Sequence, residues 1–327
     1  MKTLPFERAK RKIIIKNKSE TDPKHGCNPE KRPVEELLNY GVIDLDKPKG
    51  PTSHQVSAFV QQILNIKKSG HSGTLDPAVT GVLPVALGRA TKVIEVLLNA
   101  GKEYVAIMHL HKEVEEDKIR KTCDLFTGRI KQLPPVKSAV KREWRYRKVY
   151  YFEILEIDGK DVLFKTGCQA GTYIRKLIHD IGEELGGAHM AELRRTKAGP
   201  FNEDSLVTLQ DLTDAYHYYK NKKSEKFIRK VIMPIEEATE HMPKIWVNDN
   251  AIDSLCHGAD LGLPGISKYH SGIQKGDLVV IMSLKNELIA LGESRLVSKD
   301  LVKDKGIAVK TTKVFMLPGI YPKIKKE

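Results

Sequence analysis

Residues 70–92, GHSGTLDPAVTGVLPVALGRATK, form the stretch of sequence on which the interpretation of this chain depends. One carboxylate, Asp76, stands there among glycines, with Pro77 beside it and the cations Arg89 and Lys92 downstream. An Asp-Pro pair after a glycine-rich run is most often a turn. A lone carboxylate that is buried among apolar side chains and paired with a cation suits a nucleophile instead. The apolar residues around it are Leu75, Val79, Val82 and Leu83.

The composition indicates a polyanionic partner. The 327 residues carry a formal net charge of +13, which favours either nucleic acid or an acidic membrane surface. The longest apolar runs, such as GVLPVALG, are far shorter than the roughly 20 residues that span a bilayer. Nucleic acid is therefore the expected partner, and no membrane association is expected.

The cysteines argue against a metal or disulfide framework. Cys27, Cys123, Cys168 and Cys256 are scattered singly, without a CxxC pair or a close His–Cys set. We therefore expect neither a zinc site nor disulfides, and we expect the protein to be cytoplasmic.

The chain divides by composition into four parts. Residues 1–39 are polar and basic without periodicity, which is typical either of a solvated tail or of an arm that lies on RNA or on another domain. Residues 40–243 form the expected main domain with its linker, 244–319 a small β-barrel of short strands, and 320–327 a basic tail.

The elements expected within the main domain alternate irregularly. Residues 41–65 read as a strand, a Pro/Gly turn and a helix that Thr52 or Ser53 caps, and KEYVAIMHL reads as a strand. Two β-rich runs meet at the DGKD turn, a helix opens at Thr172, and residues 188–199 read as another short helix. Hairpins without regular βαβ repeats predict an α+β fold with a mixed, mainly antiparallel sheet.

Several residues are candidates for the site around Asp76, each with an ordinary structural alternative. Arg175 is a possible bidentate partner for the carboxylate, or a surface arginine on a helix. Tyr104 is either a core residue or a ring on which a base stacks, and His71 is either a hydrogen-bonded loop histidine or a contact to RNA. Residues 137–151 mix lysine and arginine with tryptophan and tyrosine, which fits either a nucleic-acid grip or a solvated hairpin.

Several long blocks together resemble the TruB family of pseudouridine synthases. In chain order, which is also the order of the family, they are LDKPKGPTSHQV, GHSGTLDPAVTGVLPVALGRATK, KEYVA and AGTYIRKLIHDIGEELGGAHMAELRRTKAG. Within that family the chain is similar to the archaeal dyskerin-like subunits of box H/ACA RNA-guided particles. HGADLGLPGI and the strands that follow it resemble a PUA RNA-binding domain.

The resemblance implies a role for each matching residue. Asp76 falls on the catalytic aspartate, Arg175 on the arginine that pairs with it, and Tyr104 on the tyrosine that stacks on the uracil. Tyr173 and Leu193 match positions that line the pocket, and His71 matches the histidine that fills the gap left by the flipped base. The implied RNA contacts are Arg145, Arg147 and Lys148 in the thumb loop at residues 140–148, and Gly258, Ala259 and Asp260 in the PUA domain. Lys47 and Pro48 belong to a block whose implied role is structural.

The implied reaction explains why one carboxylate suffices. Breaking the N1–C1′ bond of uridine and rejoining uracil through C5 needs a nucleophile and a closed pocket, but no cofactor and no metal. The expected substrates are rRNA, chosen by a box H/ACA guide RNA, and the T-loop of tRNA, and the expected partners include three small accessory proteins. The alternatives are a tRNA synthase that acts alone and a non-catalytic RNA-binding assembly factor.

Overall fold

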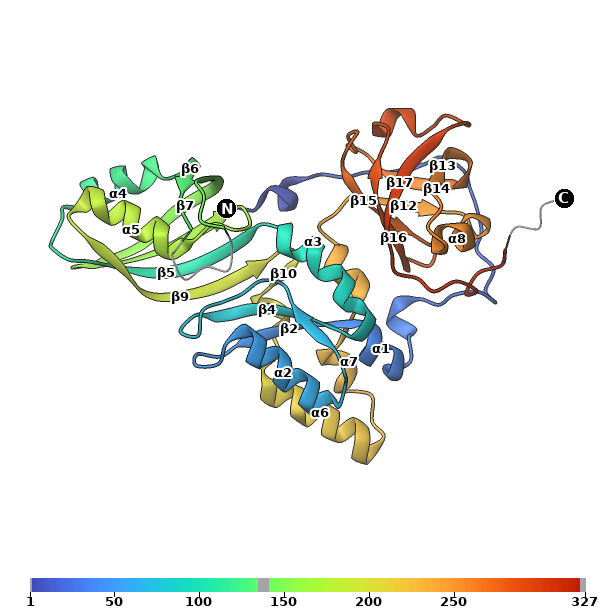
Figure 1. Ribbon diagram of the computed structural model, residues 1–327, viewed down its shortest axis with the longest axis horizontal. Coiled ribbons are helices and arrows are strands. Elements are labelled where there is room, and N and C mark those ends of the chain that lie inside the picture. The colour runs from blue at the N-terminus through green and yellow to red at the C-terminus, as the bar shows by residue number, and fades with distance from the viewer. Residues whose placement is uncertain (1, 135–140, 324–327) are drawn as a thin grey trace. The chain divides into compact units, whose positions relative to one another are not determined.

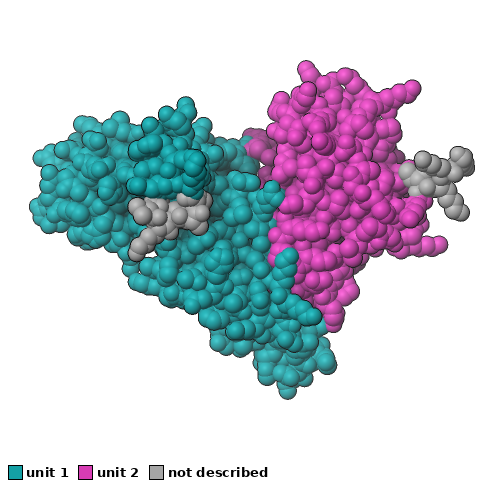
Figure 2. Space-filling model, in the orientation of Figure 1, with its two compact units in different colours: residues 1–8, 43–86, 94–231 teal, residues 9–42, 87–93, 232–327 magenta. Residues whose placement is uncertain are grey.

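The computed structural model of the protein describes residues 2–134 and 141–323. The chain forms two compact units (Figure 2). Unit 1 is drawn from the ranges Met1–Arg8, Ile43–Ala86 and Ile94–Val231, and unit 2 from Ala9–Val42, Leu87–Val93 and Ile232–Glu327. Within the described residues, no helix is long and apolar enough to cross a membrane.

A ten-stranded sheet of described residues forms the frame of the main domain (Figure 1). Its order is β11-β2-β4-β9-β5-β8-β7-β6, with β10 beside β9 and β3 beside β4. The β4–β9 pair is parallel, whereas β9–β5, β5–β8, β8–β7 and β7–β6 are antiparallel, which confirms the predicted mixed, mainly antiparallel sheet. The strands are β2 (Gly41–Lys47), β3 (Ser69–His71), β4 (Thr80–Leu87), β5 (Lys102–Leu110), β6 (Gly128–Gln132), β7 (Arg145–Asp158), β8 (Asp161–Cys168), β9 (Ala188–Ala198), β10 (Phe201–Asn202) and β11 (Met233–Pro234).

Among the α-helices up to Val231, α1 belongs to unit 2 and the others to unit 1. They are α1 (Val34–Tyr40), α2 (Ser53–Leu64), α3 (Ile94–Asn99), α4 (Glu116–Leu125), α5 (Ile174–Leu185), α6 (Leu209–Lys222) and α7 (Ile228–Val231). Apolar residues of α4 and α5, such as Ile119 and Leu177, share one core cluster with Ala106 and Met108 of β5 and with Phe164 of β8. The two helices therefore cover one face of the sheet at β5–β8.

The segment at residues 188–199, predicted to be a short helix, is the strand β9. Its backbone pairs with β5 on one side and with β4 on the other, so the helical prediction was wrong. Alanine, methionine, leucine and arginine favour a helix locally, but the hydrogen bonds of a central strand outweigh that preference.

Other local predictions are closer to the structure. Of the two predicted caps of α2, Thr52 is the N-cap, and it forms a capping box with Gln55. The helix expected from Thr172 begins at Ile174, with Tyr173 as its N-cap. Gly159 has a φ of +55° in the turn between β7 and β8, which matches the predicted DGKD hairpin.

Unit 2 contains a second sheet, of seven strands among its described residues, in the order β1-β14-β12-β15-β16-β17-β13. Its core contains Ile245, Tyr269, Ile281 and Val309 and packs against α8 (Asp249–Cys256). The strands are β1 (Ile13–Ile15), β12 (Lys244–Val247), β13 (Leu261–Gly262), β14 (Ile266–His270), β15 (Leu278–Met282), β16 (Leu288–Ser294) and β17 (Ile307–Val314). Strand β1 comes from the N-terminal segment and pairs with β14, so this segment is part of the small domain's sheet.

Candidate active site

Residues of the first sequence block hold the loop that carries Asp76. The Lys47 ammonium, which is fully buried, donates to the carbonyls of Pro48 (2.9 Å), Pro77 (3.3 Å) and Val79 (2.8 Å). The hydroxyl of Ser53 exchanges hydrogen bonds with the backbone of Leu75. The backbone on both sides of Asp76 is thus tied to β2 and to the start of α2, which fixes the direction of the carboxylate.

Asp76 forms an ion pair with Arg175, which lies in the first turn of α5 and is 99 residues away in the sequence. The pairing that the sequence suggested is therefore present. The prediction of an apolar recess around the pair is wrong, because the Asp76 and Arg175 side chains are 52% and 55% exposed. The apolar neighbours of Asp76 are buried in the core, whereas the carboxylate lies at the surface of the loop. These neighbours are Leu75, Val79, Val82 and Leu83.

Tyr104 lies near the beginning of β5, directly opposite Arg195 of β9 and Thr166 of β8. Burial raises the pKa of Tyr104, and the charge of Asp76 adds to the rise, whereas the cation and the hydrogen bond of Arg195 lower it. The phenol is therefore neutral at physiological pH and lies within electrostatic reach of the Asp76 carboxylate.

Of the two predicted pocket residues, Leu193 lies on the strand next to that of Tyr104, and Tyr173 directly precedes the helix of Arg175. Leu193 pairs with Ala106, two positions beyond Tyr104 on β5, and both Leu193 and Tyr104 pack against the core under α4 and α5. Tyr173 precedes α5, where its backbone exchanges hydrogen bonds with the Gln132 side chain at 3.0 and 3.1 Å. Gln132 thus fixes the start of the helix that presents Arg175.

His71 ends β3, five residues before Asp76, and packs edge-on against His54 at a centroid distance of 4.7 Å. Burial, His54 and Arg195 lower the pKa of His71 to about 4. Its ring is therefore uncharged at neutral pH. A neutral, partly buried ring of this kind suits insertion beside bases better than pairing with a phosphate.

Arg195 is a residue of this region that the sequence analysis missed. Its side chain is 1% exposed, and it donates to the carbonyls of Val82 (2.7 Å) and Gly73 (3.3 Å) on the two sides of the Asp76 loop. Arg194 beside it pairs with Asp46 and Glu203 instead. The signal was the Arg-Arg pair itself, because adjacent residues of a strand point to opposite faces.

The basic residues expected in a thumb loop belong in part to a strand. Arg145, Arg147 and Lys148 form the beginning of β7 and pair with β6, whereas Val140 lies outside the described residues. The Arg147 guanidinium lies over Gly171, where an added Cβ would meet its Nε at 3.1 Å. Beside it, Arg129 packs on Tyr146 and Lys131 on Trp144, with 3.8 and 4.8 Å to the ring centroids. The strand thus extends a cationic, aromatic surface towards the loop before Tyr173.

The residues predicted to read RNA in the small domain form an exposed loop after α8. Gly258 has a φ of +87°, and an added Cβ there would meet nothing within 4 Å. The carbonyl of Ala259 and the carboxylate of Asp260 accept hydrogen bonds from Thr311 of β17. The loop is thus anchored to the sheet while its outer surface remains accessible.

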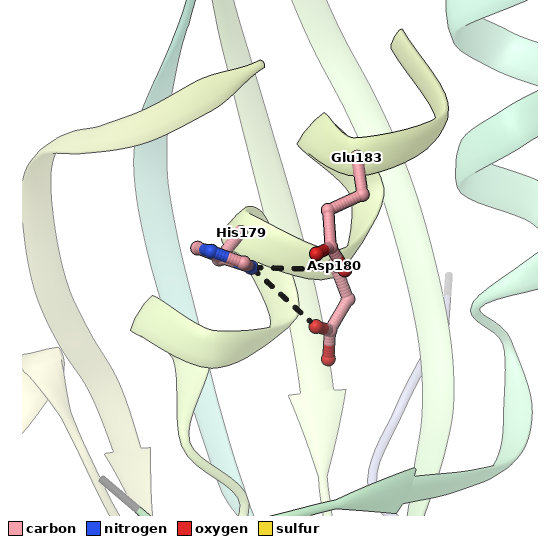
Figure 3. Close-up of side chains that lie close together, drawn as sticks. All are labelled: His179, Asp180 and Glu183. Carbon is pink, nitrogen blue, oxygen red and sulfur yellow. Dashed lines mark ion pairs between the residues drawn. The ribbon is translucent and has the colours of Figure 1, made fainter. Parts of the chain in front are cut away.

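An exposed polar cluster on α5 lies beyond Arg175 (Figure 3). His179 Nδ1 is 3.7 Å from Asp180 Oδ1 and 3.8 Å from Glu183 Oε2. The Lys176 ammonium already pairs with Asp180. This cluster is accounted for as a chain of surface ion pairs along one helix.

Comparison with known proteins places this geometry in a family. Residues 61–174 match the model of the TruB family pseudouridylate synthase N-terminal domain, and residues 175–240 match the tRNA pseudouridylate synthase B C-terminal domain. A DKCLD (NUC011) domain matches residues 2–57 and a PUA domain matches residues 243–315.

Whole-chain relatives agree with these domain matches. A probable tRNA pseudouridine synthase B of Pyrococcus abyssi is 60% identical over 96% of both chains, and one of Methanopyrus kandleri is 56% identical over 98% of this chain and 95% of the relative. Among solved structures, a chain of a Cbf5–Nop10–Gar1 complex is 56% identical, with a TM-score of 0.94 over 99% of both chains. A chain of an H/ACA RNP bound to a substrate RNA that contains 2′-deoxyuridine is 54% identical, with a TM-score of 0.92 over 98% of this chain and 99% of that chain. The protein therefore belongs to the TruB family of pseudouridine synthases.

Proposed function

We propose that this chain isomerises uridine to pseudouridine in RNA with Asp76 as the nucleophile. The observation that carries the proposal is the ion pair between Asp76 and Arg175, which joins a tightly anchored loop to the first turn of α5. The Arg175 guanidinium pairs with the carboxylate and orients it for attack on an electrophilic carbon.

The other residues of the site have roles in binding the base. The ring of Tyr104 stacks on the uracil, Tyr173 and Leu193 line the pocket, and the neutral ring of His71 occupies the space left in the RNA stack. Extruding the uridine costs about a few kcal/mol, which stacking and phosphate contacts offset. The extruded uracil covers the exposed carboxylate and removes water from the pair.

The chemistry is an internal transfer and conserves all atoms. Asp76 attacks C1′ of the ribose or C6 of the uracil, the N1–C1′ bond breaks, and the base turns. A C5–C1′ bond then forms, the proton leaves C5, N1 takes up a proton and the aspartate is released. Tyr104 is placed to assist the proton movement, because its raised pKa keeps the phenol protonated.

The substrates and partners follow from the relatives. We propose that a box H/ACA guide RNA directs this chain to uridines of rRNA in the cytoplasm, with counterparts of Nop10 and Gar1 in the same particle, and that it also modifies the T-loop of tRNA. The exposed loop of Gly258, Ala259 and Asp260 contacts the end of the guide.

Substitution of the nucleophile tests the chemical assignment. Asp76→Asn should abolish pseudouridine formation while the Kd for RNA changes by less than about threefold, because the side chain keeps its size. Asp117→Asn, an exposed aspartate on α4, is the matched control and should retain full turnover. Pseudouridine formation that survives Asp76→Asn would rule out Asp76 as the nucleophile. A loss of RNA binding in that variant would instead indicate a binding role.

A second experiment separates a guided enzyme from one that acts alone. The purified chain is incubated with unmodified tRNA and with an rRNA fragment, each with and without guide RNA and the accessory proteins. Modification of the rRNA fragment should require both additions. Robust turnover of the rRNA fragment without a guide would contradict the particle-subunit proposal.

A further inference from the structure

Three histidines meet on the sheet of unit 1, beyond the active-site ends of β5 and β9. His109 lies on β5 and His189 lies on β9, and the two are direct cross-strand partners. His111 follows β5, and its amide continues the ladder by donating to the carbonyl of Gly187 at 2.9 Å. His109 and His111 are two residues apart, so their side chains emerge on the same face as that of His189.

The rings already approach the geometry of metal ligands. His111 Nε2 lies 3.1 Å from His189 Nδ1, and the ring centroid of His189 lies 5.1 Å from that of His109 and 5.3 Å from that of His111. A tetrahedral ion that binds imidazole nitrogens at about 2.0–2.1 Å separates two ligand nitrogens by about 3.3 Å and two ring centroids by roughly 5 Å. The nitrogens of the three rings do not all lie within 4.8 Å of one another, so binding of one ion requires rotation about the side-chain bonds.

A carboxylate completes the arrangement from the next strand. Asp161 of β8 is the cross-strand partner of His109 on its other side, and its Oδ1 lies 2.7 Å from His109 Nδ1. Histidines that bind metals usually donate their second ring nitrogen to such a carboxylate, which fixes the ring and its tautomer. This leaves Nε2 of His109 as the atom that binds an ion.

The backbone makes room for the group. Gly187 has a φ of +111°, and a Cβ at this position would lie 2.5 Å from Nδ1 of His111. The rings of His111 and His189 are exposed, so an ion reaches them from solvent. The cluster on α5 differs, because the Lys176 ammonium already occupies its carboxylate Asp180.

We propose that His109, His111 and His189 bind one divalent transition-metal ion, for which Zn²⁺ is the probe, with Asp161 as a positioning residue and water as the fourth ligand. This site departs from the expectation of no zinc site, which rested on the scattered cysteines, because its ligands are all histidines. The ion joins β5 and β9, the two strands that also carry Tyr104 and Leu193 at the active site. It lies five residues along β5 from Tyr104, which is about 17 Å for an extended strand.

Metal titration of the full-length, chelator-treated chain tests this site. We expect one Zn²⁺ per chain by calorimetry, a tetrahedral nitrogen-rich absorption spectrum with Co²⁺, and a rise in Tm with Zn²⁺. His109→Ala, His111→Ala and His189→Ala should each weaken binding by more than about tenfold, and Asp161→Asn by roughly tenfold. His189→Gln, which retains polarity, should behave as His189→Ala.

His179→Ala is the matched control, because His179 belongs to the exposed cluster on α5, whose ligand atoms all lie within 4.8 Å of one another. Its affinity for Zn²⁺ and its Co²⁺ spectrum should equal those of the unmodified chain. Loss of binding in His179→Ala, unchanged binding in all three histidine variants, or no saturable binding at one equivalent would each overturn the proposal.

Discussion

Buried charged residues lie beneath the Asp76 loop, and each has a different means of compensation. Arg195 and Lys47 donate to backbone carbonyls, whereas Asp44 of β2 accepts a hydrogen bond from Ser205 at 2.8 Å and leaves its Oδ1 without a hydrogen-bond partner among the described residues. Burial raises the pKa of Asp44 to about 7, with Ser205 and Arg195 opposing the rise. This carboxyl is therefore protonated in the native state at pH values where it is ionised in the unfolded chain.

Asp44 makes stability depend on pH in a defined direction. Between its unfolded pKa of 3.8 and its native pKa of about 7, the native state holds one more proton than the unfolded state, so the free energy of unfolding falls as pH rises. Asp44→Asn removes this dependence. The stability of the native sequence relative to Asp44→Asn should fall by about 2–4 kcal/mol between pH 4 and pH 8. Urea unfolding across that range measures the difference, with Asp117→Asn as control, and a difference independent of pH would contradict the assignment.

Single residues also show which parts of the site could be predicted from the sequence. The Asp76–Arg175 pair was predicted, because the motif blocks carry both residues. The exposure of the carboxylate was not, because apolar neighbours in the sequence point into the core while the turn directs Asp76 outwards. Arg195 was missed because the adjacent pair of Arg194 and Arg195 signals opposite faces only in a strand, and this segment was predicted to be a helix.

At the scale of elements, β2 and the Asp76 loop are joined mainly through Lys47. Lys47→Met keeps the length and apolar stem of the side chain but removes the donor to three carbonyls. We expect a loss of about 2–4 kcal/mol in stability and a fall in kcat that exceeds any rise in KM, because Asp76 is less well oriented. Lys49→Met, an exposed neighbour, serves as control. Equal losses in both variants would show that Lys47 has no special role.

Strand β7 provides a test of RNA contact. Replacing Arg145, Arg147 and Lys148 with alanine should reduce the slope of log K against log salt by about two to three. Each lost phosphate contact lowers the magnitude of that slope by about 0.7–0.9. The control replaces Lys220, Lys222 and Lys223 at the exposed end of α6, which changes the net charge equally. A slope that is unchanged in the β7 variant, or equally reduced in the control, would exclude this strand from the RNA interface.

Elements differ in how well local sequence predicts them. A cap at Thr52 or Ser53 of α2 and the turn before β8 were predicted, because side-chain and backbone preferences determine them locally. Strand β9 was not, since its identity comes from pairing with β4 and β5, which are distant in the sequence. The neighbours of Leu193, Arg195 and His189 depend on the pairing of β9 with β5, so a helical prediction could not identify them.

At the scale of the molecule, the boundary expected near residue 243 stays a prediction, and the C-terminal range of unit 2 begins at Ile232. Unit 2 nevertheless includes residues 9–42 and 87–93, which local composition does not connect with the C-terminal part. Their attachment depends on contacts between distant segments. Within unit 2, Arg32 binds Glu236 through two hydrogen bonds of 2.7 and 2.8 Å, and Glu236 also accepts from the amide of Leu288 on β16.

The buried ion pair of Arg32 and Glu236 should contribute strongly to the stability of unit 2. Arg32 and Glu236 are 3% and 5% exposed, so Arg32→Met leaves a buried carboxylate without its cation and should cost about 3–5 kcal/mol. Adding Glu236→Gln removes the buried charge and should recover part of that loss. Trp246 of β12 is buried, so its fluorescence in a Trp144→Phe background reports the unfolding of unit 2. If Glu236→Gln lowers stability by the same amount in the Arg32→Met background as it does alone, the two residues act independently. That result would also show that the N-terminal segment is held by its strand β1 instead.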